Sequence, residues 1–282
     1  MIVLNNGTLE VEIEKIGAEI RKVTKDGVDR MWSGDPSYWA GVAPLLFPIV
    51  SALPDDKFTY NGKEYEMQKH GFIRKLPFEV EATADDTATF MFASNEETLK
   101  VFPWKFELRI KYTLIRDKIK VEYFVLNKSD DTMYYSIGSH EGYACPEGIE
   151  NYDIVFEKEE VLKHNLLDGM LLSGETVPVL TSGNVLPLNE KYFEIDALIF
   201  KNIQSRKASL VSRITGQTTT VHFPDCEYLL LWHAVGGPFM CIEPWWGICS
   251  TKGDSNDITK KEGIIALEGK VEKTHSHVIE FR

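Results

Sequence analysis

Apolar and polar residues alternate with a period of two along most of the chain, and helical periodicity is nearly absent. The clearest example is residues 108–114, where every second residue is apolar, followed by polar residues at 116–118 and a second alternating run at 119–125. Successive side chains of a strand point to opposite faces of a sheet. The pattern therefore predicts a hairpin with one apolar face.

Shorter segments of the same kind recur along the sequence. Strands are predicted at residues 9–13, 58–60, 78–82, 88–93, 154–156, 208–213, 218–223, 228–232, 239–243 and 277–281. Helical signals are limited to residues 98–101 and 257–261, with Asp257 as a candidate N-cap. So many short strands separated by turn residues indicate an all-β fold, a large antiparallel β-sandwich, and leave no room for a doubly wound nucleotide-binding fold.

Nothing in the sequence divides the chain into parts. The 282 residues contain no linker rich in Pro, Gly or Ser and no internal repeat, so a single β-sandwich domain is expected over residues 1–282. The least regular stretch, 157–193, carries several Gly and Pro residues and is predicted to form an excursion of loops and short hairpins. Such excursions often shape binding sites.

The formal net charge of -12 limits the choice of partners. It repels nucleic acid and anionic membrane surfaces, and it weighs mildly against a strongly anionic substrate. The first residues lack the features of a signal peptide, and no apolar stretch approaches the ~20 residues of a membrane span. A cytoplasmic protein that binds neither nucleic acid nor membranes is expected.

Cysteine and histidine spacing indicates neither a disulfide framework nor a metal site. The four cysteines form no C-x-x-C pair and have no histidine at zinc-finger spacing, so reduced and mostly buried thiols are predicted. His275 and His277 are spaced for weak chelation, but they lie on the predicted terminal strand, where no carboxylate partner is expected beside them. No metal site is therefore expected.

Three residues stand out as candidates for acid–base chemistry. Glu243 ends an apolar strand and is followed by Pro, two Trp and Gly, an aromatic setting that would desolvate the carboxylate and raise its basicity. His140 ends another aromatic, apolar strand, and His70 lies at the start of a His-Gly-Phe-Ile-Arg loop. The alternatives are a solvent-facing glutamate and histidines with structural roles, the reading given to the other five histidines.

Several segments in this order resemble the aldose 1-epimerase (galactose mutarotase) family, especially its divergent bacterial branch. They are residues 32–35, 44–48 and 57–65, the His-Gly-Phe-Ile-Arg loop at 70–74, Gly-Ser-His at 138–140 and Glu-Pro-Trp at 243–245. The resemblance implies a galactose mutarotase-like sandwich with an open cleft, a small-molecule sugar as substrate, and no metal or cofactor. A monomer or homodimer is expected.

The resemblance also assigns roles to individual residues. Mutarotation needs a base for the anomeric hydroxyl and an acid for the ring oxygen. Glu243 matches the family's general base and His140 its general acid, with no covalent intermediate.

Other residues would bind the sugar. His70 matches a second histidine that hydrogen-bonds the substrate, and Asp196 matches an aspartate that binds sugar hydroxyls. Arg74 would bind substrate or orient Glu243, unless it makes a structural ion pair. Trp245 and Trp246 would offer an aromatic face to the sugar.

Two departures from the family pattern touch the sugar pocket. Many members carry a substrate-binding arginine shortly after the Phe-Pro segment, whereas residues 49–54 read Ile-Val-Ser-Ala-Leu-Pro. A Pro and an aromatic usually follow the histidine, whereas Glu141-Gly142-Tyr143 follows His140.

The leading hypothesis is a mutarotase for neutral hexoses. Its alternatives are a hexose-6-phosphate 1-epimerase and a non-catalytic carbohydrate-binding protein; a glycoside hydrolase would need a second carboxylate.

Overall fold

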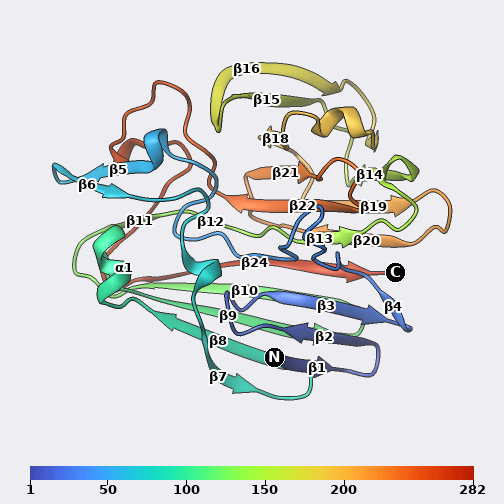
Figure 1. The fold of residues 1–282 in the computed structure, drawn as a ribbon, viewed down its shortest axis with the longest axis horizontal. Helices are drawn as coiled ribbons and strands as arrows, with labels where there is room; N and C mark the ends of the chain where they lie inside the picture. Colours follow the sequence, from blue (N-terminus) through green and yellow to red (C-terminus); the bar gives the residue numbers. More distant parts are fainter.

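The computed structural model describes all residues from Met1 to Arg282, and antiparallel strands dominate it (Figure 1). The largest sheet has nine strands. Their order in space is Val185–Pro187 (β17), Tyr152–Phe156 (β14), Lys207–Ser212 (β19), Thr218–His222 (β20), Glu272–Phe281 (β24), Lys118–Asn127 (β10), Phe106–Ile115 (β9), Thr87–Ala93 (β8) and Glu79–Thr83 (β7). The predicted hairpin at 108–125 is the central β9–β10 pair, and the all-β prediction is confirmed.

Smaller sheets complete the fold. A five-stranded sheet contains Ile137–Gly138 (β12), Phe239–Trp246 (β22), Tyr228–Trp232 (β21) and Leu198–Lys201 (β18), with Gly142–Ala144 (β13) also paired to β22. A four-stranded sheet contains Ile2–Asn5 (β1), Leu9–Ile13 (β2), Ile20–Lys25 (β3) and Val28–Asp29 (β4). Three two-stranded pairs are Lys57–Tyr60 with Lys63–Glu66 (β5–β6), Met133–Tyr135 with Ile265–Leu267 (β11–β23), and Leu162–Asp168 with Leu171–Leu180 (β15–β16).

Helices are few and short, as the sequence predicts. The α-helix Glu96–Val101 (α1) begins after Asn95, whose side chain accepts from the backbone amides of Glu97 and Thr98 in a capping box. The second predicted segment is a single 3-10 turn, Ile258–Lys260 (η5), capped by Asp257 as expected. Four further 3-10 turns are Pro54–Asp56 (η1), Ile73–Lys75 (η2), Ile149–Asn151 (η3) and Glu190–Phe193 (η4). None of the helices is long and apolar enough to cross a membrane.

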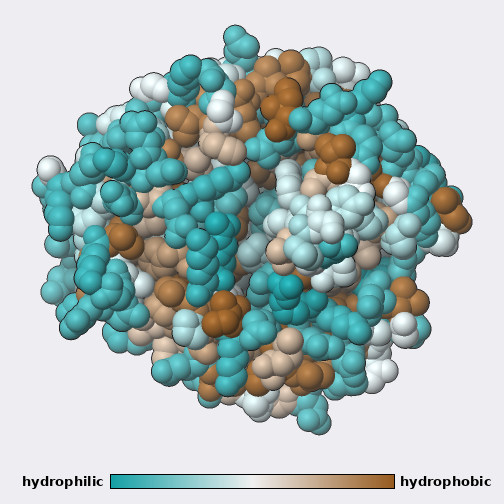
Figure 2. All heavy atoms as spheres, viewed as in Figure 1, coloured by the Kyte–Doolittle hydropathy of each residue, from teal (hydrophilic) through white to brown (hydrophobic).

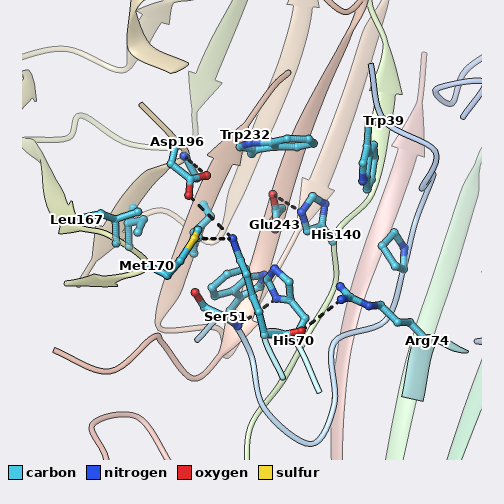
Figure 3. Close-up of a pocket in the computed structure, with 16 residues that line it drawn as sticks. Trp39, Ser51, His70, Arg74, His140, Leu167, Met170, Asp196, Trp232 and Glu243 are labelled. Carbon is cyan, nitrogen blue, oxygen red and sulfur yellow. Dashed lines mark hydrogen bonds and ion pairs between the residues drawn. The ribbon is translucent and has the colours of Figure 1, made fainter. Parts of the chain in front are cut away.

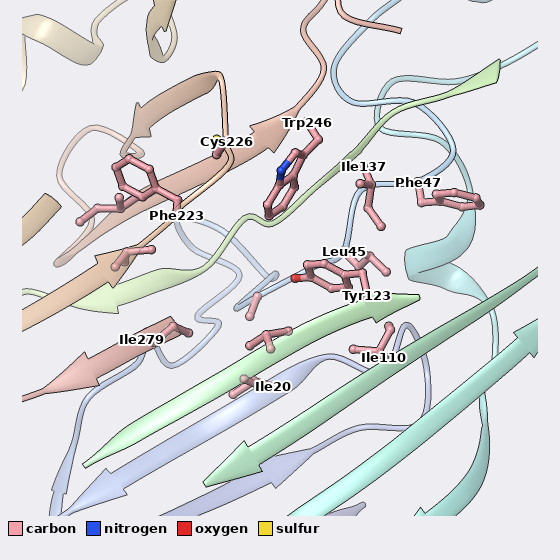
Figure 4. Packing of buried hydrophobic residues seen from close by; sticks show 14 of the residues in the cluster. Ile20, Leu45, Phe47, Ile110, Tyr123, Ile137, Phe223, Cys226, Trp246 and Ile279 are labelled. Atoms are coloured by element: carbon pink, nitrogen blue, oxygen red, sulfur yellow. The ribbon is translucent and has the colours of Figure 1, made fainter. Parts of the chain in front are cut away.

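The main core fills the space over one face of the nine-stranded sheet. Alternate residues of β9 and β10 are buried, and Tyr123 of β10 meets Trp246 of β22 with 6.2 Å between ring centroids (Figure 4). On the same face, the Tyr112 hydroxyl donates to the Ala18 carbonyl beside β3 at 2.7 Å. The cluster runs from Leu4 to Phe281, which supports our proposal that residues 1–282 form one domain.

The burial of the cysteines and the polarity of the surface also agree with what the sequence indicates. All four cysteines are free and buried, as predicted. In the view of Figure 2 the surface is mainly hydrophilic, and apolar residues lie in small separate groups. Such scattered apolar residues are normal for a protein surface.

Strand β22 differs from its prediction in a way that matters for the site. The strand continues to Trp246, so Glu243 lies within it and not at its end. Pro244 is tolerated because its nitrogen and carbonyl point toward the interruption between β12 and β13, where the Pro244 carbonyl accepts from the Ser139 amide at 3.2 Å. His140 lies in this interruption, next to Glu243.

The predicted excursion at 157–193 is built mainly of the β15–β16 hairpin, which lies at the top of Figure 1. Two hydrogen bonds tie it to β18: the Asn165 side chain donates to the Ile199 carbonyl at 3.0 Å, and the Ile199 amide donates to His164 Nδ1 at 3.0 Å. The hairpin is thereby held beside the five-stranded sheet.

Lys261 gives the fold a testable pH dependence. Its buried amine donates to the carbonyls of Ile248 and Glu262, and burial lowers its pKa to about 8. Between pH 8 and 10.5 the unfolded chain binds a proton that the folded chain has lost, so this residue's contribution to stability rises with pH, by roughly 3 kcal/mol. Chemical denaturation of wild type and Lys261→Met should show that the free energy of unfolding of wild type rises relative to that of the variant between pH 7.5 and pH 10. A pH-independent difference would contradict the shift.

Candidate active site

A cleft of about 280 Å³ opens over the five-stranded sheet (Figure 3). Its residues come from distant parts of the chain: the segment between β4 and η1, the loop after β6 with η2, the β12–β13 connection, the β15–β16 hairpin, the loop between η4 and β18, and β18, β21 and β22. The lining residues are Trp39, Pro44, Ser51, Lys69, His70, Arg74, His140, Leu167, Met170, Asp196, Ala197, Ile199, Leu230, Trp232, Glu243 and Trp245. Six of the seven residues predicted from sequence are among them.

The two predicted acid–base residues are in direct contact. His140 Nε2 lies 3.5 Å from Glu243 Oε1. The Glu243 side chain is 1% exposed and that of His140 13% exposed. The second carboxyl oxygen of Glu243 and Nδ1 of His140 are buried without a hydrogen-bond partner in the protein. A buried carboxyl and imidazole therefore share one side of the cleft.

Burial acts against the charged form of both groups. It raises the pKa of Glu243 well above its ordinary value, with a further contribution from the neighbouring Glu141 and Asp196 carboxyls. It lowers the pKa of His140 to about 3, and Lys69 and Arg74 add to this effect. The 3.5 Å separation acts in the opposite direction, because each charge would stabilise the other. Such opposed shifts within a cleft are typical of proton-transfer sites.

His70 is held in one orientation at the edge of the cleft. Its Nδ1 accepts a hydrogen bond from the Ser51 amide at 3.0 Å, so the neutral ring carries its proton on Nε2. Burial lowers the pKa of His70 well below its ordinary value, which keeps the ring neutral. The backbone of His70 has a φ of 67°, a strained left-handed conformation for a non-glycine residue. A neutral N–H donor is thus fixed beside His140, 5.9 Å away between ring centroids.

Charged side chains flank the acid–base pair. Arg74 donates to the Lys69 carbonyl at 3.2 Å and forms no ion pair, so the structural ion pair considered from the sequence is not present. Asp196 lines the cleft as predicted and lies 3.9 Å from Lys69 Nζ. Lys69 was not singled out from the sequence, although it directly precedes His70.

The two tryptophans after Glu243 lie on opposite faces of β22. Trp245 faces the cleft with Glu243, and its Nε1 donates to the Ser139 carbonyl at 3.1 Å. Gly138 permits this packing, since a Cβ there would come within 2.5 Å of the Trp245 ring. The prediction of Trp246 as a sugar-binding residue is wrong: strand alternation turns it into the core, 5.0 Å from the His275 ring.

Two other tryptophans form the aromatic wall that the sequence analysis missed. Trp39 and Trp232 lie 4.9 and 5.3 Å from the His140 ring, measured between centroids (Figure 3). Trp232 could have been predicted, because it lies two residues after Leu230, on the same face of a strand that is close in sequence to Glu243. Trp39 lies in an irregular segment, and no local pattern points to the cleft.

The remaining histidines have structural partners or lie outside the cleft. His233 bridges Glu190 at 2.8 Å and the Phe239 carbonyl at 2.9 Å. His277 contacts Glu141 at 3.0 Å, and both are buried between the sheets. Glu141, which replaces the family's usual proline, therefore points away from the cleft that His140 lines.

The fold and the site together define an antiparallel β-sandwich protein with a buried carboxyl–imidazole pair in an open cleft. The aldose 1-epimerase family model matches residues 1–260. The chain belongs to the aldose 1-epimerase family, as the sequence motifs indicated.

Similar proteins cover most or all of the chain. The plasmid-encoded protein LacX of Lactococcus lactis subsp. lactis is 33% identical over 275 residues, which cover 92% of each chain. A galactose mutarotase related enzyme from Lactobacillus acidophilus is 30% identical, with a TM-score of 0.93 over 100% of this chain and 97% of the other. A galactose mutarotase-like protein from Lactobacillus casei is 28% identical, with a TM-score of 0.95 over 100% of both chains.

Proposed function

We propose that the protein is an aldose 1-epimerase that interconverts the α and β anomers of a hexose. The observation that carries the proposal is the contact between Glu243 and His140 in a cleft of sugar size. The anomeric and ring oxygens of a pyranose are bonded to the same carbon, so an acid and a base 3.5 Å apart can serve both.

The proposed reaction consists of two balanced proton transfers. Glu243 takes the proton of the anomeric hydroxyl while the bond from C1 to the ring oxygen breaks, and His140 gives a proton to that ring oxygen. The open-chain aldehyde rotates about its first carbon–carbon bond and closes on the other face by the reverse transfers. Each cycle returns both residues to their starting protonation states. The scheme starts from a carboxylate beside a protonated imidazole; burial acts against both charges, and the 3.5 Å contact between the two groups is what favours this state.

The other lining residues would hold the sugar. His70 offers an N–H donor, Asp196 a carboxylate for hydroxyl groups, and Trp245, Trp39 and Trp232 offer apolar ring faces.

The proposal is tested by polarimetry or exchange NMR of freshly dissolved α-anomers across a panel of aldoses, with and without protein. Binding without accelerated mutarotation would favour the carbohydrate-binding alternative. A cytoplasmic location and a monomeric or dimeric state stay predictions from the sequence.

One observation favours a hexose-6-phosphate 1-epimerase as a second candidate. Arg74 is the one cationic residue that the sequence motifs place in the sugar pocket, and the structure adds Lys69 to the same cleft. Arg74 has no carboxylate partner, so it could bind a phosphate without losing an ion pair. We retain the neutral hexose as the proposed substrate, because Asp196 and Glu243 also face the cleft and the net charge is -12.

Comparison of substrates separates these candidates. We expect kcat/KM for free glucose or galactose to exceed that for the corresponding 6-phosphate, because the carboxyl groups in the cleft would repel the negatively charged phosphate. Arg74→Ala and Lys69→Ala provide the matched controls. A clear advantage for the phosphate that both variants abolish would overturn the neutral-substrate proposal and establish the second candidate.

A further inference from the structure

Cys241 brings a thiol to the acid–base pair. It precedes Glu243 by two residues on β22, so strand alternation places both side chains on the same face. Ligand atoms of Cys241, Glu243 and His140 all lie within 4.8 Å of one another. No local pattern indicated this set, because His140 is about one hundred residues away in the chain.

These side chains have atoms that no other protein group binds. Cys241 is fully buried, and no hydrogen bond involves its sulfur, unlike Cys145 and Cys226, whose thiols contact backbone carbonyls. The second oxygen of Glu243, itself 1% exposed, is also unpartnered. An unpartnered buried carboxyl oxygen beside an uncommitted thiol is costly unless another ligand satisfies it.

The donor set matches one class of ion. A thiolate, a carboxylate and a neutral imidazole carry two negative charges, which complement a divalent cation. Sulfur, nitrogen and oxygen at about 2.0–2.3 Å from the metal are the ligands of tetrahedral zinc sites, and three protein ligands leave one position open. Zinc-bound ligands would lie about 3.3–3.8 Å apart. His140 and Glu243 are already 3.5 Å apart, and atoms at the 4.8 Å limit of the set would have to approach by about 1 Å.

We propose that Cys241, Glu243 and His140 form an inhibitory Zn²⁺ site in the floor of the cleft. The ion enters through the cleft, since His140 and Glu243 line it while Cys241 lies beneath. Coordination occupies both proton-transfer groups, so the metal competes with the sugar. The inhibitory effect rests on the proposed function, whereas the binding site itself does not.

Binding is tested without any enzymatic readout. Titration of metal-free protein with CoCl₂ should give one ion per chain with a sulfur-to-cobalt charge-transfer band, and ZnCl₂ should displace it. Cys241→Ala should abolish the band, whereas Cys145→Ala, which removes a buried thiol elsewhere, should retain it. Absence of the band in wild type, or its persistence in Cys241→Ala, would overturn the site. If Cys241→Ala does not fold, Cys241→Ser keeps the side-chain shape and should still lose the charge-transfer band.

Inhibition is tested by polarimetry on a sugar that the protein turns over. Equimolar Zn²⁺ should lower the wild-type rate at least tenfold and the Cys241→Ala rate less than twofold, and saturating sugar should weaken Zn²⁺ binding. Activity should survive exhaustive EDTA treatment. Loss of activity with EDTA that Zn²⁺ restores would overturn inhibition in favour of a catalytic metal. If no sugar is turned over, the proposed function fails, and the cobalt titration still decides the metal site.

Discussion

Glu243→Gln is expected to lower the catalysed mutarotation rate at least ~10²-fold, the lower end for loss of a positioned acid or base. The amide keeps the size of the carboxyl but cannot accept the proton of the anomeric hydroxyl. Stability should be retained, because burial already disfavours the charged carboxylate and a neutral amide fits the same space. Polarimetry gives the rate, and thermal denaturation checks the fold.

His140→Asn should have a comparable effect, since it removes the proposed donor to the ring oxygen while leaving Glu243 in place. Glu262→Gln is the matched control: it changes an exposed glutamate that pairs with Lys201 outside the cleft, and its rate should equal that of wild type. A near-wild-type rate in either cleft variant would remove that residue from the mechanism. Loss of sugar binding with unaltered turnover at saturation would assign the residue to binding alone.

Gly71→Ala is expected to destabilise the protein by roughly 2–5 kcal/mol, through a left-handed backbone and an overpacked contact. Gly71 has a φ of 67°, and a Cβ there would come within 2.2 Å of the Phe47 carbonyl oxygen. That oxygen also accepts from the amides of Phe72 and Ile73, so it cannot move away freely. The neighbouring His70 should be displaced, and the affinity for sugar should fall together with stability.

Gly62→Ala separates the two causes of this effect. Gly62 has a similar φ of 75°, but a Cβ there meets no atom within 4 Å. Its substitution should therefore cost only about 1 kcal/mol from the backbone conformation. Chemical denaturation of both variants measures the difference. Equal destabilisation would show that the clash with Phe47 contributes nothing.

Local patterns in the sequence determined the strands and part of the site. Residues 9–13 and 228–232 were predicted with the bounds the structure has. The first alternates because one face is buried, and the second is a short continuous apolar run because both of its faces are buried. Strand β4, at 28–29, carried no such signal, because both of its residues are exposed. Glu243, His140, His70 and Trp245 stood out through residue types that are chemically unusual in their local setting, whereas Arg74 and Asp196 were assigned through the resemblance to the aldose 1-epimerase family.

Tertiary structure alone decided which of these residues meet. Glu243 was predicted at the end of a strand, but the gap between β12 and β13 accommodates Pro244 and lets β22 continue. Because β22 continues, Trp246 points into the core. The aromatic wall of the cleft is formed by Trp39 and Trp232 instead. The contact of His140 with Glu243 and Cys241 joins segments about one hundred residues apart, and sheet pairing, not local sequence, sets that distance. Periodicity reports which face of a strand is buried, whereas the partners across that face depend on how the sheets pack.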